Sequence, residues 1–395
     1  MTAGTEESQP LTSIEICAGA GGQAVGLHNA GFRHLALLEI DKFASKTLRT
    51  NVRDHPDWAG CEVIEGDVKD VDPFGHEQLV KFGLKPGELD LLAGGVPCPP
   101  FSVAGRQLGA EDERDLFPRM LELVDQLRPK AVMIENVKGI LEAKFEGYRD
   151  QIVAELEGYG YDFCGWELIE ACRYGVPQLR PRAILVMIAK EFTADVKFEW
   201  PVGDDSIVSV ADALAETMQE RCKPYGPRGQ DVFDKWLKKA QGRGTEAPTL
   251  VGGSKKHGGA DLGPSRAKAA WAALGVDAMG VANDPEECVP DRDLFRENGP
   301  MLTVEQAAII QGFPRHWKFE GGKTARYRQV GNAFPPPVAE AVGRAIAAVL
   351  RPEAPGLSAE GIVSDGQELL PAARRGAELG STAEDRSRDL QAAVL

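Results

Sequence analysis

The sequence lacks paired cysteines, long apolar runs and an amino-terminal apolar stretch. Its seven cysteines are an odd number, are scattered and never form a Cys-x-x-Cys arrangement, which favours reduced thiols over disulfides or a zinc site. No apolar run is long enough to span a bilayer, and residues 1–10 are polar and acidic, unlike a secretion signal. These absences predict a soluble cytoplasmic protein with neither a bound metal nor a membrane partner.

An excess of positive charge is also missing. The chain has 45 Lys and Arg against 60 Asp and Glu, a formal net charge of -15, whereas proteins that bind nucleic acid are usually basic. The charge is unevenly distributed along the chain. Although the whole chain is acidic, residues 221–270 carry eleven Lys and Arg against four Asp and Glu. Such a basic segment fits a local contact with phosphates, but charge alone fits a solvated surface equally well.

Short apolar runs alternate with amphipathic stretches over the first half of the chain. Runs typical of strands lie at 13–17, 34–39, 89–93, 131–134 and 183–188, with helical patterns at 23–30, 42–51 and 117–127. This alternation predicts an α/β fold with a mostly parallel sheet. Helical patterns return at 303–311 and 337–350.

Composition predicts how the chain is divided. Residues 11–190 and 297–351 are expected to form one domain, interrupted by residues 191–296. The interruption is rich in Gly, Pro and Lys with little sustained helical period, so we expect a smaller irregular domain there. Residues 1–10 and 352–395 are expected to be disordered.

A glycine-rich turn, Ala18-Gly19-Ala20-Gly21-Gly22, follows the first expected strand. Glycine lets the backbone approach a nucleotide-type cofactor closely, although such a turn can also be purely structural. Glu39 ends the second strand, where a carboxylate can accept ribose hydroxyls, and Asp67 follows the third, where an acid can meet an adenine amino group. The turn lacks Gly-x-Gly-x-x-Gly spacing, so S-adenosylmethionine fits better than a nicotinamide cofactor.

Cys98 directly follows the fourth expected strand, in Val96-Pro97-Cys98-Pro99. A lone cysteine is usually a small buried hydrophobe. Open α/β sheets, however, bind ligands at the carboxyl ends of their strands, and the flanking prolines restrict the thiol. The next stretch, 103–115, is charged and contains glycine, as expected of a mobile lid. We therefore predict that Cys98 is a nucleophile.

Two further strand ends carry charge. Glu135 follows four apolar residues and is either a catalytic acid or an ordinary helix cap. Arg180 and Arg182 alternate on entering the next strand, so both side chains should point to one face, toward a base edge or a phosphate. A solvated edge strand is the alternative for the arginines.

Taken in order, these motifs resemble those of the bacterial DNA cytosine-5 methyltransferases. The matching segments are 18–22, Pro97-Cys98, Glu135-Asn136-Val137, Gln178-x-Arg180-x-Arg182, 302–314 and 328–333. One such motif is only suggestive, whereas six in order are specific. The resemblance covers residues 12–346 and implies a Rossmann-like methyltransferase fold that uses S-adenosylmethionine.

The resemblance implies a covalent mechanism on a cytosine flipped out of double-stranded DNA, because the duplex buries both faces of the base. Cys98 would add to carbon 6, and Glu135 would contact ring nitrogen 3 and the exocyclic amine. Arg182 would bind the carbonyl oxygen while Arg180 helps to orient the base. Glu15 and Cys17 stand where the family often has aspartate and phenylalanine, so a ring stacked on adenine is expected to be missing.

Contacts with the cofactor and with DNA follow from the same resemblance. We expect the cofactor to contact Cys17, Ala18, Gly19, Gly21, Gly22, Glu39, Ile40, Asp67, Val68, Leu116, Asn332 and Ala333. The family reads DNA with the stretch that corresponds to 191–296, and its glycine-rich segment 249–259 can enter a groove or be a loop of no consequence. Expected DNA contacts are Ser102, Arg106, Thr249, Lys255, Lys256 and Arg266.

Three functions remain open at this point. The favoured one is methylation of a specific DNA sequence by a cytoplasmic, nucleoid-associated monomer, either solitary or paired functionally with a restriction endonuclease. A transfer-RNA cytosine-5 methyltransferase shares the catalytic motifs, but the large basic insertion favours duplex DNA. A catalytically inactive DNA-binding descendant is disfavoured because Cys98, Glu135 and Arg182 are all present.

Overall fold

The computed structural model describes residues 9–53, 55–97, 115–205, 207–242, 244–252 and 260–352. Five residues with predicted roles lie outside the described residues, namely Cys98, Ser102, Arg106, Lys255 and Lys256. The lid expected at 103–115 lies outside them except for its last residue, and so do nearly all of the two ends expected to be disordered. These predictions therefore stay predictions.

Seven strands form one sheet in the described part of the chain, in the order β3-β2-β1-β4-β5-β7-β6. They are β1 (Leu11–Ile16), β2 (Phe32–Glu39), β3 (Glu62–Glu65), β4 (Leu91–Gly94), β5 (Ala131–Val137), β6 (Tyr161–Glu170) and β7 (Pro181–Ala189). β1 to β5 pair in parallel, whereas β7 pairs antiparallel with both β5 and β6. The predicted mostly parallel α/β sheet is confirmed.

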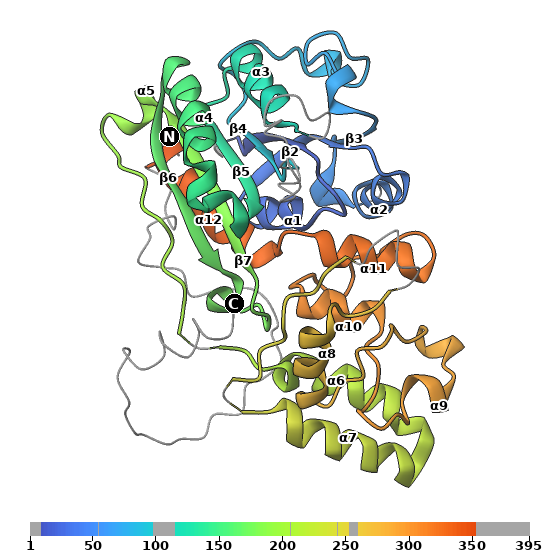
Figure 1. Ribbon diagram of the computed structural model, residues 1–395. Coiled ribbons are helices and arrows are strands. Elements are labelled where there is room, and N and C mark those ends of the chain that lie inside the picture. Colours follow the sequence, from blue (N-terminus) through green and yellow to red (C-terminus); the bar gives the residue numbers. More distant parts are fainter. Residues whose placement is uncertain are drawn as a thin grey trace, which may run out of the picture. The chain divides into compact units, whose positions relative to one another are not determined.

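The central strands read as continuous apolar runs because helices cover both faces of the sheet. Successive side chains of a strand point to opposite faces. Leu91 of β4 accordingly packs in one cluster with Val338 and Val342 of α12 (Pro336–Leu350), beside α1 (Gly22–Asn29). Its neighbour Leu92 packs in another cluster with Met120 of α3 (Phe117–Leu127), on the side that α4 (Glu146–Gly158) also covers (Figure 1).

The prediction of an irregular insertion is wrong in its secondary structure. Residues 191–296 contain α6 (Val210–Cys222), α7 (Gly226–Ala240), α8 (Ser265–Ala273) and the short α9 (Pro290–Asp293). α7 buries Phe233, Trp236 and Ala240, which are three and four residues apart as one helix face requires. Gly and Pro at the start of α7, and Asp and Lys between the buried positions, concealed the helical period in the sequence.

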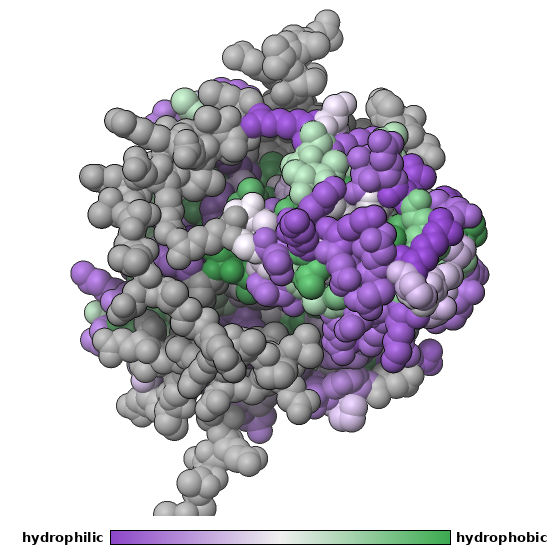
Figure 2. Space-filling view, turned by 90° about the horizontal axis from the view of Figure 1, so that it is seen from below, coloured by the Kyte–Doolittle hydropathy of each residue, from purple (hydrophilic) through white to green (hydrophobic). Residues whose placement is uncertain are grey.

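The insertion is joined to the sheet through two helices of the returning chain, α10 (Val304–Ile310) and α11 (Lys323–Asn332). α11 contacts α2 (Lys42–Val52) beside the sheet and α10, and α10 contacts α6 (Figure 1). Side chains of the insertion and of the returning chain share one apolar core, in which Trp236 and Trp271 are fully buried. The face seen from the side of α7 is mostly hydrophilic where its residues are described (Figure 2).

None of the described helices combines the length and apolar character needed to cross a membrane. Nor do the described residues contain a group of three or more His, Cys, Asp or Glu side chains suited to holding a metal ion.

Candidate active site

The glycine-rich turn after β1 depends on two of its glycines for different reasons. Gly21 has a φ of 91°, in the left-handed region that favours glycine. A Cβ on Gly22 would lie 2.1 Å from the carbonyl oxygen of Phe334, so α1 can begin there only without a side chain. Trp317 holds the turn from outside, because its indole nitrogen donates to the carbonyl of Ala20 at 2.9 Å.

Glu39, at the end of β2, closes the same turn. Its Oε2 accepts from the backbone nitrogen of Gly19 and its Oε1 from that of Asp41, both at 2.7 Å. Burial raises the pKa of the Glu39 carboxyl, and these backbone hydrogen bonds partly offset the rise. Each carboxylate oxygen can accept a second hydrogen bond. Glu39 can therefore receive ribose hydroxyls while it keeps the turn in place.

A cavity of about 360 Å³ opens beside this turn. Seven of the twelve residues expected at the cofactor line it: Cys17, Ala18, Gly19, Gly22, Glu39, Asn332 and Ala333. Glu135, Gly95 and Pro97 line the same cavity. The cofactor turn and the catalytic strand ends are thus brought together, as the order of the strands requires.

The other five expected cofactor residues do not line this cavity in the described part of the chain. A Cβ on Gly21 would meet Trp317, and the Asp67 carboxylate accepts from the backbone nitrogen of Lys69 at 3.0 Å. Ile40 is exposed, Val68 is buried in the core, and Leu116 packs against that core. Their expected contacts with the cofactor stay predictions.

Glu135 and Arg182 form an ion pair at the edge of the cavity. Nε of Arg182 lies 2.7 Å from Oε1 of Glu135, and both side chains are largely buried. Burial raises the pKa of the Glu135 carboxyl, and the charges of Arg182 and Arg180 partly offset the rise. The neighbouring Asn136 donates to the carbonyl of Val96 at 3.0 Å. This bond ties the end of β5 to the chain two residues before Cys98.

Arg180 does not share the environment of Arg182. Its side chain is 1% exposed, and its guanidinium donates to the backbone carbonyls of Leu250, Gly331 and Ala333. The expectation that both arginines face a base or a phosphate is therefore corrected for Arg180, because both of its terminal amino groups donate to buried backbone carbonyls. Arg180 can orient the base only indirectly, by holding these segments.

Glu15 is a residue of the cavity to which the sequence assigned no role. It lines the cavity, is 1% exposed, and its Oε2 has no hydrogen-bond partner among the described residues. Burial raises its pKa well above the usual value, and the charges of Glu39 and Glu135 raise it further. The sequence signals were an acid inside an apolar strand and its place where the family often has an aspartate. With Asp41, four acidic residues line this cavity, and they suit a cationic ligand.

The described residues expected to contact DNA lie in two settings. Thr249 is half-buried, and its hydroxyl donates to the carbonyl of Leu179. That bond attaches the segment of Thr249 to residues 178–182, which we call the arginine motif. Arg266 is exposed in the first turn of α8.

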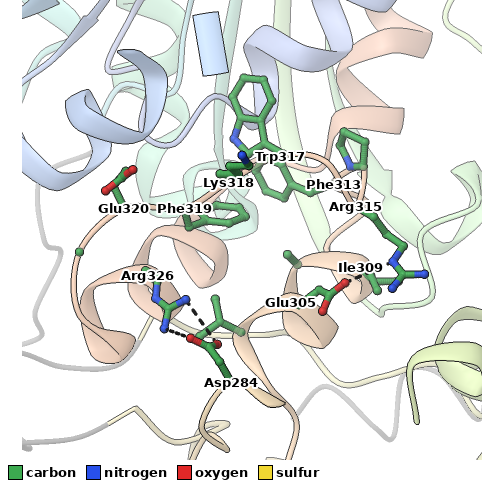
Figure 3. A pocket seen from close by; sticks show the side chains of 14 residues that line it. Asp284, Glu305, Ile309, Phe313, Arg315, Trp317, Lys318, Phe319, Glu320 and Arg326 are labelled. Atoms are coloured by element: carbon green, nitrogen blue, oxygen red, sulfur yellow. Dashed lines mark hydrogen bonds and ion pairs between the residues drawn. The ribbon is translucent and has the colours of Figure 1, made fainter. Parts of the chain in front are cut away.

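A second cavity, of about 400 Å³, lies between α10 and the chain that leads into α11 (Figure 3). Charged groups in its wall are paired with one another, Arg315 with Glu305 at 3.2 Å and Arg326 with Asp284 at 2.7 Å. Trp317, which supports the glycine turn, also lines it. Trp317 is the residue through which this cavity adjoins the cofactor turn.

A model of the C-5 cytosine-specific DNA methylase family matches residues 11–348. The type II methyltransferase M.NaeI of Lentzea aerocolonigenes is 48% identical over 349 residues, which cover 88% of this chain and 77% of that protein. M.NgoMIV of Neisseria gonorrhoeae is 45% identical over 348 residues, which cover 87% of this chain and 99% of that protein.

Solved structures share the fold at lower identity. A putative DNA modification methyltransferase encoded within an Escherichia coli prophage has a TM-score of 0.59 and 22% identity, over 86% of this chain and 99% of that chain. A mutant of Spodoptera frugiperda DNMT2 has a TM-score of 0.54 and 17% identity, over 86% of this chain and 99% of that chain.

Proposed function

Because the chain belongs to the C-5 cytosine-specific DNA methylase family, it is a DNA cytosine-5 methyltransferase that uses S-adenosylmethionine, and we propose that Cys98 is its nucleophile. The observation that carries the proposal is the position of Pro97. This residue directly precedes Cys98 and lines the same cavity as Glu135 and the cofactor turn.

The described cysteine in this cavity is a poor alternative nucleophile. Only Cys17 among the described cysteines lines the cavity. Burial raises the pKa of its thiol to about 12, and the charges of Glu39 and Glu15 contribute. Cys17 therefore stays a neutral thiol at neutral pH, whereas the attacking species must be a thiolate.

The proposed reaction begins when the Cys98 thiolate adds to carbon 6 of the flipped cytosine, forming a sulfur–carbon bond and placing an electron pair on the ring. Glu135 fits the acid at ring nitrogen 3, because its carboxyl lines the cavity and burial raises its pKa above the usual carboxyl value. Arg182, held by the same ion pair, would bind the carbonyl oxygen. The nucleophilic carbon 5 would then take the methyl group of S-adenosylmethionine, whose sulfur keeps the electrons of the broken bond. Loss of the carbon 5 proton to a base then returns the electron pair to the ring and breaks the bond to Cys98.

The cavity fits the cofactor, which supplies an electrophilic methyl group on a sulfonium. The orphaned carboxylate oxygen of Glu15 lies in its wall, where a cation would give it a partner. Glu39 fits the ribose hydroxyls, and the turn from Ala18 to Gly22 lets the backbone come close to the ligand. The thiol of Cys17 replaces the ring that the family often has, so affinity for the adenine is expected to be lower.

We also propose that residues 191–296 recognise the DNA sequence and that 11–190 with 297–351 form the catalytic domain. The relatives named above are type II methyltransferases, which favours DNA over transfer RNA and a functional pairing with a restriction endonuclease. We further propose that the protein acts in the cytoplasm as a nucleoid-associated monomer. Bisulfite sequencing of DNA from a host that expresses the chain identifies the target sequence.

Trapping on DNA that contains 5-fluorocytosine tests the nucleophile, because fluorine blocks the final elimination. The wild-type protein is expected to form a covalent complex, and Cys98→Ser is expected to form none while still binding S-adenosylmethionine. Cys164→Ser is the matched control, since this thiol on β6 does not line the cavity. A Cys98→Ser variant that is still trapped, or a wild-type protein that prefers transfer RNA to plasmid DNA, overturns the proposal.

A further inference from the structure

A buried polar network joins the insertion to the wall of the cofactor cavity. Gln178, Arg180 and Gln311 are 0%, 1% and 0% exposed. Arg180 donates to the carbonyl of Leu250 in the insertion at 2.6 Å, and to those of Gly331 and Ala333 at 2.8 and 2.9 Å. One side chain thus holds backbone from both sides of the junction.

Gln178 and Gln311 complete the network. Oε1 of Gln178 accepts from the backbone nitrogen of Leu250 at 2.8 Å, while its Nε2 donates to Oε1 of Gln311 at 2.8 Å. Gln311 in turn donates to the carbonyl of Ala333. Because buried amides that lose a partner are costly, the network favours a displacement of the two segments together over a displacement of one alone.

The insertion segment is also paired along its backbone. Ala247 accepts from the nitrogen of Leu179 at 2.8 Å and donates to the carbonyl of Pro177 at 2.9 Å. The hydroxyl of Thr249 donates to the carbonyl of Leu179. The position of segment 247–252, which we define by these contacts, is therefore set by the arginine motif.

Segment 247–252 ends directly against a residue of the cofactor cavity. A Cβ on Gly252 would lie 2.1 Å from Oδ1 of Asn332, and a Cβ on Gly331 would lie 2.6 Å from the Cα of Gly252. A side chain on Gly331 would therefore collide with backbone, whereas one on Gly252 would meet chiefly the side chain of Asn332. Asn332 and the following Ala333 line the cavity. Gly252 does not line it in the described part of the chain.

We propose that segment 247–252 is a positioning element of the cofactor site, which holds the Asn332 amide in place and so couples cofactor binding to DNA binding. The coupling rests on the proposed function, in which the insertion binds DNA. A shift of this segment on DNA binding moves the backbone that Gly252 presents to Asn332. By thermodynamic linkage, DNA then changes the affinity for S-adenosylmethionine by the same factor as the cofactor changes the affinity for DNA.

The variant Gly252→Ala tests this element without removing a hydrogen bond of the network. The new methyl group overlaps the far end of the Asn332 side chain, which can rotate away, so the protein is expected to fold. Gly280→Ala is the matched control, because its Cβ would have only ordinary contacts, the nearest to Met301 at 3.5 Å. Thermal unfolding checks that both variants are folded.

The measurement is the dissociation constant of S-adenosylmethionine for the full chain, by calorimetry, with and without duplex DNA that carries the target sequence. Gly252→Ala is expected to weaken cofactor binding about tenfold without DNA. The dissociation constants of S-adenosylmethionine with and without DNA are expected to become nearly equal in this variant, because the coupling is lost. Gly280→Ala is expected to match the wild type. In an Asn332→Ala background, Gly252→Ala is expected to have little further effect, because the displaced amide is gone.

Wild-type cofactor affinity in folded Gly252→Ala overturns the proposal, as does an undiminished effect in the Asn332→Ala background. Both results leave the proposed function intact, since trapping on DNA tests that separately. Conversely, a wild-type protein that is not trapped on DNA would refute the proposal that Cys98 is the nucleophile. The effect of Gly252→Ala on cofactor affinity would still stand.

Discussion

Nε of Arg182 lies 2.7 Å from Oε1 of Glu135, between the neighbouring antiparallel strands β7 and β5. The pair fixes one carboxylate oxygen and leaves the other near Gly95, where an added Cβ would lie 3.0 Å from Oε2. A side chain on Gly95 would therefore crowd the acid in the cavity. The free oxygen is the one that can meet a base, and the pair holds it in a single orientation.

Glu135→Gln is expected to lower kcat roughly 10²- to 10⁴-fold, which is the usual contribution of a positioned general acid. The amide oxygen can still accept from Arg182, so the variant should remain folded and bind S-adenosylmethionine. Methyl transfer to DNA under saturating substrates measures the effect. Glu167→Gln, an exposed position on β6, is the control, and a Glu135→Gln rate within threefold of wild type would exclude the acid role.

Gly22→Ala is expected to destabilise the protein by about 1–3 kcal/mol and to weaken cofactor binding. The reason is that the new Cβ meets a backbone oxygen, that of Phe334, at 2.1 Å, and no side-chain rotation can relieve the overlap. Urea unfolding and cofactor titration measure both effects. Gly147→Ala in α4, where nothing lies within 4 Å of the added Cβ, should be neutral or slightly stabilising; equal behaviour of the two variants would contradict the prediction.

Glu15→Gln is expected to stabilise the protein at pH 7.5 by about 1–3 kcal/mol, since a buried unpaired acid is costly. Burial raises the pKa of Glu15, so the folded state keeps a proton that the unfolded chain releases. The wild type therefore loses stability as pH rises above the usual carboxyl range, and the advantage of the variant should shrink toward pH 4.5.

The same substitution should weaken binding of S-adenosylmethionine, because a cation bound in the cavity would favour the ionised form of Glu15, and glutamine cannot take that charge. Unfolding curves between pH 4.5 and 8, with a cofactor titration at pH 7.5, test both statements. A variant that is less stable than wild type at pH 7.5 would show that Glu15 has a partner that satisfies its charge.

His34 is expected to make the protein sensitive to acid. Burial lowers the pKa of its ring to about 4, and its two nitrogens are engaged by Ser13 Oγ and the Ala24 carbonyl, each at 2.9 Å. The unfolded ring has a pKa near 6.5, so stability is lost as pH falls from about 6.5 toward 4, by up to about 3 kcal/mol.

His34→Gln tests this, because glutamine can donate to Ala24 and accept from Ser13 without titrating. The variant should lose less stability than the wild type between pH 7 and pH 4.5 in urea unfolding, whatever its stability at pH 7. Parallel pH dependences would assign the acid sensitivity to another group, such as the partly buried His28, whose pKa is also lowered by burial.

The sequence by itself determined the features that depend on neighbouring residues. Apolar runs and helical spacing gave the strands of the parallel sheet and the helices α2, α3 and α12. The glycines after β1 predicted a cofactor turn, and seven of twelve expected cofactor residues line one cavity. These inferences succeeded because a buried strand and a tight turn each leave a local pattern.

Only the tertiary structure decided the features that depend on distant partners. β6 is an edge strand with a mixed apolar and polar pattern, and the helices of the insertion are hidden among Gly, Pro and Lys, so neither stood out in the sequence. Glu15 looks like an ordinary acid until the fold buries it beside Glu39 and Glu135.

Arg180 and Arg182 are two residues apart and were expected to act alike. Arg182 pairs with an acid from β5, whereas Arg180 binds carbonyls 70 and more residues away along the chain. Burial and long-range hydrogen bonds arise only when distant segments pack together, and a local pattern carries no record of which segments those are. The roles of the two arginines could therefore be separated only in the folded chain.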